Sequence, residues 1–175
     1  MMNSIQDNNY SIREAVSSDV DAIAELHVKT FIETHGTFNA PTIDIRKWQW
    51  AEIFKQNDGS WFCFVIENDK KELIGFAKGQ VYNHSDHPDF KGELNKIYVL
   101  KKYHRLGLGT LLIQHVANKF LNEDISSMLL FGDAKNSSNG FYERLGAERL
   151  YSKKGAFHGG YGWRDLEKLN SWRHG

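Results

Sequence analysis

A pair of glycines separates two apolar segments in the stretch YHRLGLGTLL, residues 103–112. The segment before the pair, GELNKIYVL (92–100), has the composition of a β-strand, and the segment from about 107 to 121 has the apolar spacing of a helix. Glycine adopts positive φ easily and lets other groups come close to the main chain. The stretch therefore predicts a strand-to-helix junction that another group approaches closely.

Periodicity and turn residues predict the other elements. We expect strands in 10–15, in SWFCFVIE and ELIGFAKGQVY on either side of NDKK, in 127–131, and in ERLY and FHGGYGWRDL near the end, with helices at about 17–36, 44–55 and 137–145. Ser18 or Asp19 is expected to cap the first helix and Gly36 to close it. The sum is one mixed α/β domain over residues 10–170, antiparallel in its first half, after a frayed segment 1–9.

Composition narrows the class of protein. The chain has 22 basic and 22 acidic residues, so it carries no global charge that would attract nucleic acid or an anionic membrane. Cys63 is the only cysteine, which excludes an intrachain disulfide and a multi-cysteine metal site. The N-terminus is polar, and the apolar runs are far shorter than a membrane span. We therefore expect a cytoplasmic protein without nucleic-acid or membrane partners.

The glycine pair has two explanations. A helix N-terminus presents unpaired amides and the positive end of the helix dipole, so a glycine loop that leads into one suits a pyrophosphate. The two phosphate loops defined by spacing do not fit, because Gly109 is followed by Thr110 rather than by lysine, and Leu112 occupies the third glycine position of a dinucleotide fingerprint. The other explanation is a tight turn with close helix packing.

The run IYVLKKYHRLGLGTLL resembles the acetyl-CoA-binding segment of the GNAT superfamily of N-acetyltransferases. Four further segments resemble parts of this family in the same order: IREAVSSDVDAIAEL, ELIGFAKGQV, NSSNGFYERLGAE and, in one bacterial subgroup, GYGWRDL. The resemblance covers most of residues 10–168. It implies the acyl-CoA N-acyltransferase fold, a mostly antiparallel sheet that is splayed at one parallel strand pair and flanked by helices.

The resemblance also implies a binding site for acetyl-CoA as the co-substrate. The residues expected to hold it are Ile97, Tyr98, Val99, His104, Arg105, Leu106, Gly107, Leu108, Gly109, Thr110 and Asn136. Main-chain amides are expected to provide most of the binding to the pyrophosphate. His104 stands where the family usually has Gln or Arg. An imidazole still donates a hydrogen bond to a phosphate oxygen. Asn136 has a second explanation as a helix N-cap, and Lys101 and Lys102 are either phosphate partners or solvated lysines.

Two residues are candidates for proton transfer. Glu93, eleven residues before His104, matches the general base of some family members, although a strand-end carboxylate beside ordered water is the alternative. Tyr142 matches a tyrosine that protonates or positions the departing thiolate, and its phenol stays protonated at neutral pH. The alternative for Tyr142 is a core aromatic residue.

These features predict an N-acetyltransferase that moves an acetyl group to a primary amine of a small molecule or peptide by direct attack in a ternary complex. The alternative is a catalytically silent acyl-CoA-binding or regulatory domain of the same fold. The amine is expected near the first two helices, where Phe31, Glu33, His35 and Trp48 stand, and near Asp86. A homodimer is compatible with the sequence.

Two other groups of reactive side chains, at Cys63 and in the 84–89 segment, are not expected to act as a nucleophile or as a metal site. Cys63 lies in an alternating strand, where a small buried thiol is the ordinary interpretation, so an acetyl-cysteine route is not expected. His84 and His87, with Asp86 and Asp89 nearby, have ligand-like spacing, but a single loop cluster is typical of a solvated or substrate-lining loop. No metal is expected.

Overall fold

The computed structural model describes residues 10–132, 134–135 and 138–171. The chain divides into two compact units, Met1–Lys78 with Lys96–Leu112, and Gly79–Asn95 with Ile113–Gly175. The predicted frayed segment 1–9 lies outside the described residues.

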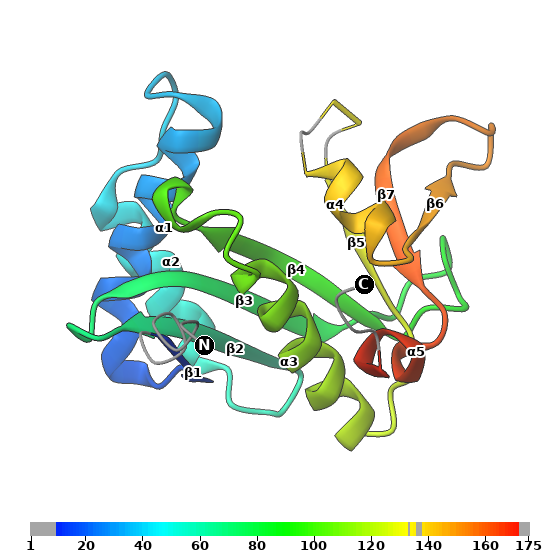
Figure 1. The fold of residues 1–175 in the computed structure, drawn as a ribbon, viewed down its shortest axis with the longest axis horizontal. Helices are drawn as coiled ribbons and strands as arrows, with labels where there is room; N and C mark the ends of the chain where they lie inside the picture. Colours follow the sequence, from blue (N-terminus) through cyan, green and yellow to red (C-terminus); the bar gives the residue numbers. More distant parts are fainter. Residues whose placement is uncertain (1–9, 133, 136–137, 172–175) are drawn as a thin grey trace, which may run out of the picture. The chain divides into compact units, whose positions relative to one another are not determined.

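The strands hydrogen-bond in the order β1-β2-β3-β4-β5-β7-β6 (Figure 1). The pair β4–β5 is parallel, whereas β1–β2, β5–β7 and β6–β7 are antiparallel. The strands are β1 (Tyr10–Glu14), β2 (Trp61–Asn68), β3 (Leu73–Val81), β4 (Gly92–Val99), β5 (Met128–Phe131), β6 (Glu148–Tyr151) and β7 (Phe157–Trp163). The predicted mixed α/β sheet with one parallel pair is therefore confirmed.

The helices also follow the sequence periodicity. They are α1 (Val20–His35) preceded by η2 (Ser17–Asp19), α2 (Ile43–Lys55), η3 (Lys101–Tyr103), α3 (Leu108–Asn122), α4 (Asn139–Arg144) and α5 (Leu166–Ser171). Helix α5 was not predicted, because the last strand was expected to continue to Leu166. The strand ends at Trp163, and the Asp165 side chain accepts a hydrogen bond from the amide of Glu167 at 3.1 Å, which favours a helix start. None of the helices in the described ranges combines the length and apolarity that a bilayer crossing requires.

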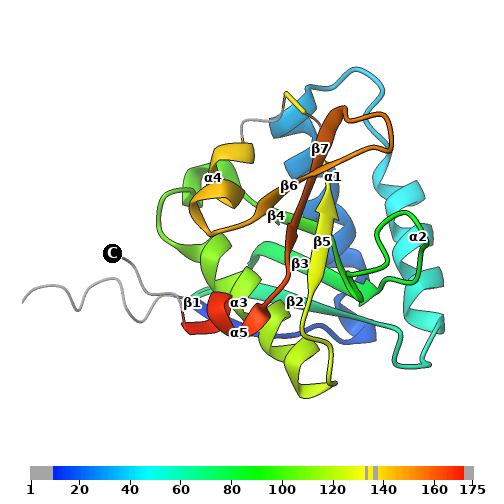
Figure 2. The ribbon, with the colours of Figure 1, turned by 90° about the vertical axis from the view of Figure 1, so that its right-hand side faces the viewer.

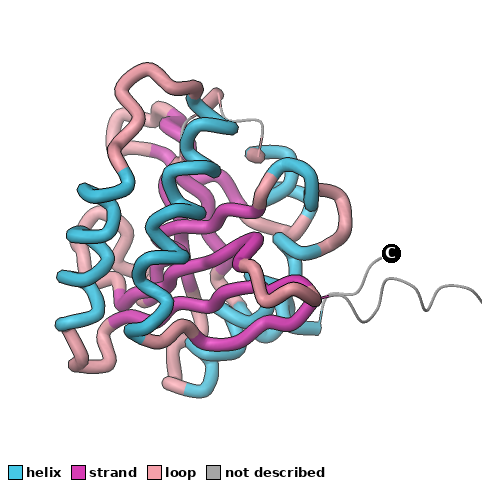
Figure 3. Tube along the Cα trace, turned by 90° about the vertical axis from the view of Figure 1, so that its left-hand side faces the viewer, coloured by secondary structure: helices cyan, strands magenta, loops and turns pink. Residues whose placement is uncertain are grey.

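The core of the first unit lies between its helices and its strands. Helices α1 and α2 lie side by side over one face of the strands (Figure 3). His27 from α1 and Trp50 from α2 both contact the ring of Phe76 on β3, with ring centroids 5.4 and 5.6 Å apart, respectively. These three side chains are almost completely buried. The packing fixes the inner faces of both helices against β3.

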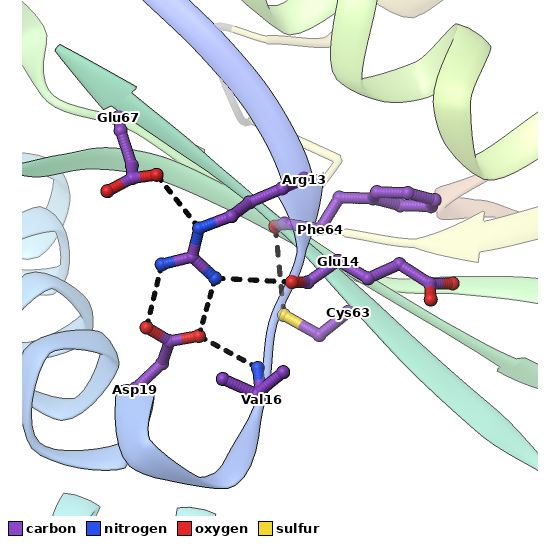
Figure 4. A network of polar contacts seen from close by, with 7 residues as sticks. All are labelled: Arg13, Glu14, Val16, Asp19, Cys63, Phe64 and Glu67. Atoms are coloured by element: carbon purple, nitrogen blue, oxygen red, sulfur yellow. Dashed lines mark hydrogen bonds and ion pairs between the residues drawn. The ribbon is translucent and has the colours of Figure 1, made fainter. Parts of the chain in front are cut away.

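An ion-pair network fixes the start of α1 (Figure 4). The Arg13 guanidinium on β1 donates to both carboxylate oxygens of Asp19 at 2.8 Å and to Glu67 on β2 at 2.8 Å. Asp19 also accepts from the amide of Val16 at 2.8 Å, so it occupies the N-cap position without capping the helix through its side chain. The hydrogen bond from Arg13 lowers the pKa of Asp19. Helix α1 therefore starts from a point tied to two strands.

The core of the second unit is built on β5, β7 and β6, which lie next to one another (Figure 2). Met128, Leu129 and Tyr161 from these strands have no exposed surface. Gly162 leaves room for the ring of Phe90, since a Cβ atom there would come within 2.5 Å of it. The tight contact explains why glycine occupies this position near the end of a buried strand.

Candidate active site

The glycine loop lies where β4 gives way to α3, as predicted. Arg105 and Gly107 both have left-handed backbone conformations, with φ of 65° and 80°. The amide of Leu111 makes a helical hydrogen bond to the oxygen of Gly107 at 3.1 Å. The amides of Leu108, Gly109 and Thr110 belong to the first helical turn, which provides no intrahelical acceptor for them. The main chain here therefore presents consecutive donors at the positive end of a helix, which is the arrangement that a pyrophosphate requires.

Side chains brace the backbone that enters this loop. The Nε2 atom of His104 lies 2.7 Å from the oxygen of Val99, so the ring donates back to the end of β4. The amide of Lys101 donates to the Glu33 carboxylate of α1 at 2.9 Å. His104 and Glu33 thus hold the main chain between β4 and the loop. Glu33, which was expected near the acceptor amine, contacts this backbone.

The other basic and apolar side chains of the loop differ in exposure. Arg105 and Leu106 are exposed, whereas Leu108 and Thr110 are buried. Lys102 lines a hollow of about 380 Å³ together with Lys29, and its ammonium lies 5.3 Å from the ring centroid of Tyr103. Side chains of α1, the β2–β3 turn, the start of β3 and the segment 100–103 complete this lining, two glutamates among them. Mixed charges of this kind are typical of a solvated surface, which favours that explanation for Lys102.

The strand β4 pairs with β5 over a short stretch. In the described residues the parallel register covers Gly92 with Met128 and Glu93 with Leu129. Ile97, Tyr98 and Val99 lie farther along β4 and are half-buried, although burial on both faces was expected for the end of this strand. Incomplete burial at the end of a central strand is compatible with a ligand that packs there.

Glu93 lies at the start of β4 and is half-buried. One carboxylate oxygen accepts a hydrogen bond from the side-chain amide of Gln80 at 3.0 Å, and the other accepts from Asn95 at 3.4 Å. Two amide donors orient the carboxylate and leave further lone pairs on each oxygen. A carboxylate held in this way can accept a proton from an amine or from a bridging water.

Tyr142 lies on α4 and is 8% exposed. Its ring packs against those of Tyr161 and Trp163, with centroids 5.8 and 6.4 Å apart, respectively. The Tyr161 hydroxyl donates to Glu143 at 2.6 Å, and the Trp163 indole donates to the oxygen of Leu145 at 3.0 Å. Both neighbours are therefore anchored, so the Tyr142 ring has a fixed position. This packing is compatible with a core aromatic residue and with a phenol that is held in position to donate a proton.

Asn136, predicted as a further coenzyme contact, lies outside the described residues.

Cys63 does not have the surroundings of a nucleophile. Its side chain is 3% exposed, and burial raises the pKa of the thiol to about 12. Almost none of it is therefore thiolate at neutral pH, and the thiolate is the reactive form. This favours direct transfer over an acetyl-cysteine route.

The histidines of the 82–90 loop pack against aromatic rings. The His84 ring lies 5.8 Å from that of Tyr82, and the His87 ring lies 6.0 Å from that of Phe131. Within the part of the chain that the structure describes, no three His, Cys, Asp or Glu side chains gather as a metal ion would require.

Sequence reasoning did not identify Arg46, a half-buried cation on α2. Its guanidinium carbon lies 5.9 Å from the ring centroid of Phe31, which also stacks with His35 at 4.8 Å. A signal was present in the sequence, because Arg46 stands four residues before the buried Trp50 and so shares its helix face. A basic residue on an inward stripe is uncommon without a partner.

Comparison with known sequences gives the same family as the resemblance. The model of a family described as "Acetyltransferase (GNAT) family" matches residues 20–147. A Bacillus subtilis (strain 168) protein, named as the uncharacterized N-acetyltransferase YuaI, is 28% identical over 174 residues, which cover 92% of this chain and 96% of that protein.

Solved structures share the fold at low sequence identity. The PaiA N-acetyltransferase of Thermoplasma acidophilum in complex with coenzyme A has a TM-score of 0.68 and 16% identity, covering 87% of this chain and 97% of its own. An N-acetyltransferase of Staphylococcus aureus Mu50 has a TM-score of 0.68 and 21% identity, covering 91% and 99%. The yncA protein of Salmonella typhimurium, solved with its cofactor acetyl-CoA, has a TM-score of 0.66 and 19% identity, covering 91% and 95%.

Proposed function

Because the chain belongs to the acetyltransferase (GNAT) family, we propose that it transfers the acetyl group of acetyl-CoA to a primary amine of a small molecule or peptide. The observation that carries the proposal is the loop before α3, where Arg105 and Gly107 turn the main chain so that the amides of the first helical turn stand free. Two solved structures of the same fold hold coenzyme A or acetyl-CoA, which supports the choice of ligand.

The chain offers main-chain groups along the whole proposed path of the coenzyme. The amides from Arg105 to Thr110 would bind the pyrophosphate, since the His104 amide already donates to the oxygen of Lys101 at 3.1 Å. Ile97, Tyr98 and Val99 on β4 would bind the pantetheine arm as an additional strand does. Asn136 is proposed as a further contact with the coenzyme. The half-buried state of β4 at these residues supports this assignment. Bound in this way, acetyl-CoA supplies an activated thioester.

Two side chains would move the protons of the reaction. Glu93 would accept a proton from the ammonium group of the acceptor, directly or through a water, and the free amine would attack the acetyl carbonyl. As the C–N bond forms and the C–S bond breaks, Tyr142 would donate its phenolic proton to the departing thiolate, and the second proton that the nitrogen loses on becoming an amide would return to the phenolate through water. The two amide donors on Glu93 and the fixed ring of Tyr142 support these roles, because both hold their groups in defined positions.

Calorimetry and a turnover screen test the proposal together. We expect acetyl-CoA to bind with a Kd in the micromolar range, and at least one amine of a broad panel to stimulate release of the coenzyme thiol. Binding of acetyl-CoA without amine-dependent thiol release would identify the silent acyl-CoA-binding domain instead. No uptake of acetyl-CoA at millimolar concentration would reject both.

A further inference from the structure

The first two turns of α2 present their side chains in an unusual arrangement. Arg46 and Gln49 are half-buried on the side that carries Trp50, whereas Ile45 and Trp48 are 49% and 64% exposed. A helix that served packing alone would place the apolar pair inside and the polar pair outside. The reversed order indicates that the inner side of this helix has a polar function.

The charge of Arg46 has no acidic partner among the residues that the structure describes. One terminal nitrogen donates to the Gln49 side chain at 3.0 Å, and the buried Nε atom has no hydrogen-bond partner. Burial lowers the pKa of Arg46, and the nearby Tyr98 phenol acts in the opposite direction. A half-buried cation without a counter-charge costs free energy. An anionic ligand would offset this cost.

The surroundings of Arg46 add positive potential and aromatic surface. The buried His27 ring lies 5.5 Å from that of Tyr98, and its pKa is lowered to about 3 by burial and by the charges of Arg46 and Lys96. Phe31 lies below the Arg46 guanidinium. The half-buried rings of Phe31 and Tyr98 therefore both lie near the Arg46 cation, and their apolar surface beside this charge suits a molecule with an anionic group and a short carbon chain.

Tyr98 connects this surface with the proposed reaction. Its main chain belongs to the part of β4 that is proposed to bind the pantetheine arm, and its ring contacts those of His27 on α1 and Phe76 on β3, with centroids 5.5 Å apart in both cases. A molecule bound on Phe31 and Tyr98 would thus lie against the strand that presents the thioester. The inference that follows rests on the proposed acetyltransferase function.

We propose that the acceptor amine carries a carboxylate that pairs with Arg46, so that the substrates are amino-acid-like amines. The planar guanidinium has further N–H donors besides the one bound to Gln49, and it matches the geometry of a carboxylate. The carbon chain of the substrate would lie on Phe31 and Tyr98 while its amine is directed along β4. A simple diamine or polyamine would place a second cation beside Arg46 and would be disfavoured.

Matched amines that differ in one carboxylate test this proposal by thiol release from acetyl-CoA. Suitable pairs are 4-aminobutyrate with propylamine and L-lysine with cadaverine. We expect the acid of at least one pair to have a kcat/KM at least tenfold higher than its partner, equivalent to about 1.4 kcal/mol. Arg46→Met should raise KM for that acid by at least tenfold and leave the carboxylate-free amine unchanged, and Arg46→Lys should recover part of the loss. Lys55→Met, which removes an exposed charge from the same helix, is the control.

The outcomes separate the inference from the function on which it rests. Failure of the unmodified protein to bind acetyl-CoA in calorimetry would reject the acetyltransferase proposal. Equal or better turnover of the carboxylate-free amines, or an equal effect of Arg46→Met on both members of a pair, would reject the carboxylate site alone. Where neither amine of a pair is acetylated, the increase in Tm that each amine causes in the presence of coenzyme A is compared between the two. A stabilisation by the acid that does not exceed that by its partner would also overturn the proposal.

Discussion

The imidazole of His104 donates to the main-chain oxygen of Val99 across 2.7 Å and so satisfies a carbonyl at the end of β4. His104 occupies the position where the family usually has Gln or Arg. This contact supports a role for His104 in the shape of the loop, and we expect the phosphate contacts of the proposed coenzyme site to come from the main chain. The residue that departs from the family pattern is therefore compatible with an intact coenzyme site.

We predict that His104→Gln changes the affinity for acetyl-CoA by only a few-fold. The glutamine amide can donate to Val99 in place of the ring, and the main-chain donors of the loop remain. Isothermal titration calorimetry measures the Kd directly. A loss of more than about a hundredfold, or 2.7 kcal/mol, would show that the imidazole rather than the backbone dominates binding.

Gly107→Ala is expected to weaken acetyl-CoA binding by about tenfold. Gly107 has a φ of 80°, and no atom lies within 4 Å of a Cβ built there, so the substitution strains the backbone without a clash. Gly155→Ala is a matched control, because its φ is 82° and its Cβ also meets open space, but it lies in the turn between β6 and β7. Both variants should lose about 1–2 kcal/mol of unfolding free energy. Equal acetyl-CoA affinity in the two variants would contradict the loop assignment.

Glu93→Gln should lower kcat by about a hundredfold or more and remove the acidic limb of the pH–rate profile. The substitution keeps the size of the side chain and removes the carboxylate that Gln80 and Asn95 hold in place. Steady-state kinetics over a pH range measures the effect, with Glu123→Gln, exposed in the turn directly after α3, as the control. A near-native rate with the acidic limb intact would leave deprotonation to ordered water.

Tyr142→Phe should reduce turnover at least tenfold and leave the Kd for acetyl-CoA unchanged, because only the proton donor is lost. Tyr161→Phe is the matched variant within the same aromatic cluster. It removes the hydroxyl that donates to Glu143 and should cost about 1 kcal/mol of stability without a comparable loss of turnover. Equal turnover of Tyr142→Phe and the unmodified protein would establish Tyr142 as a core aromatic residue only.

The buried His27 should make the protein less stable in acid. Its folded-state pKa of about 3 lies below the ordinary value of 6.5, so between these values the unfolded chain binds a proton that the folded chain excludes. The contribution is therefore fully present above pH 6.5 and decreases as the pH falls, by at most about 1.4 kcal/mol per pH unit. Urea unfolding of His27→Gln, which can still accept from Trp50, should show a smaller loss between about pH 7 and pH 5. Identical pH profiles would rule out this origin.

Much of the fold was predictable because local patterns and tertiary packing agree. The β-rich composition of β2 and β3, the helical spacing of α3 and the φ of 88° at Gly146 after α4 all act within a few residues, so the sequence carries them directly. Helix α5 was missed because six residues carry too little periodicity to separate a short helix from the end of a strand. Local chemistry at Asp165 decides its start.

The candidate site was predictable where it depends on the backbone. The glycine loop follows from its position between a strand and a helix, but the partners of Glu33 and His104 depend on segments that packing brings together. Arg46 became evident from burial, since no pattern in the sequence shows that its Nε atom is enclosed without an acceptor. Long-range contacts of this kind are set by tertiary structure and not by local spacing.

The hydrogen bond from the amide of Lys101 to Glu33 connects α1 with the backbone that leads into the glycine loop. The last turns of this helix carry both Phe31, the proposed surface for the acceptor, and the carboxylate that holds the chain entering the coenzyme loop. Any slide or rotation of α1 would displace Phe31 and Glu33 together, so in the proposed site this one helix would set the distance between the acceptor and the coenzyme.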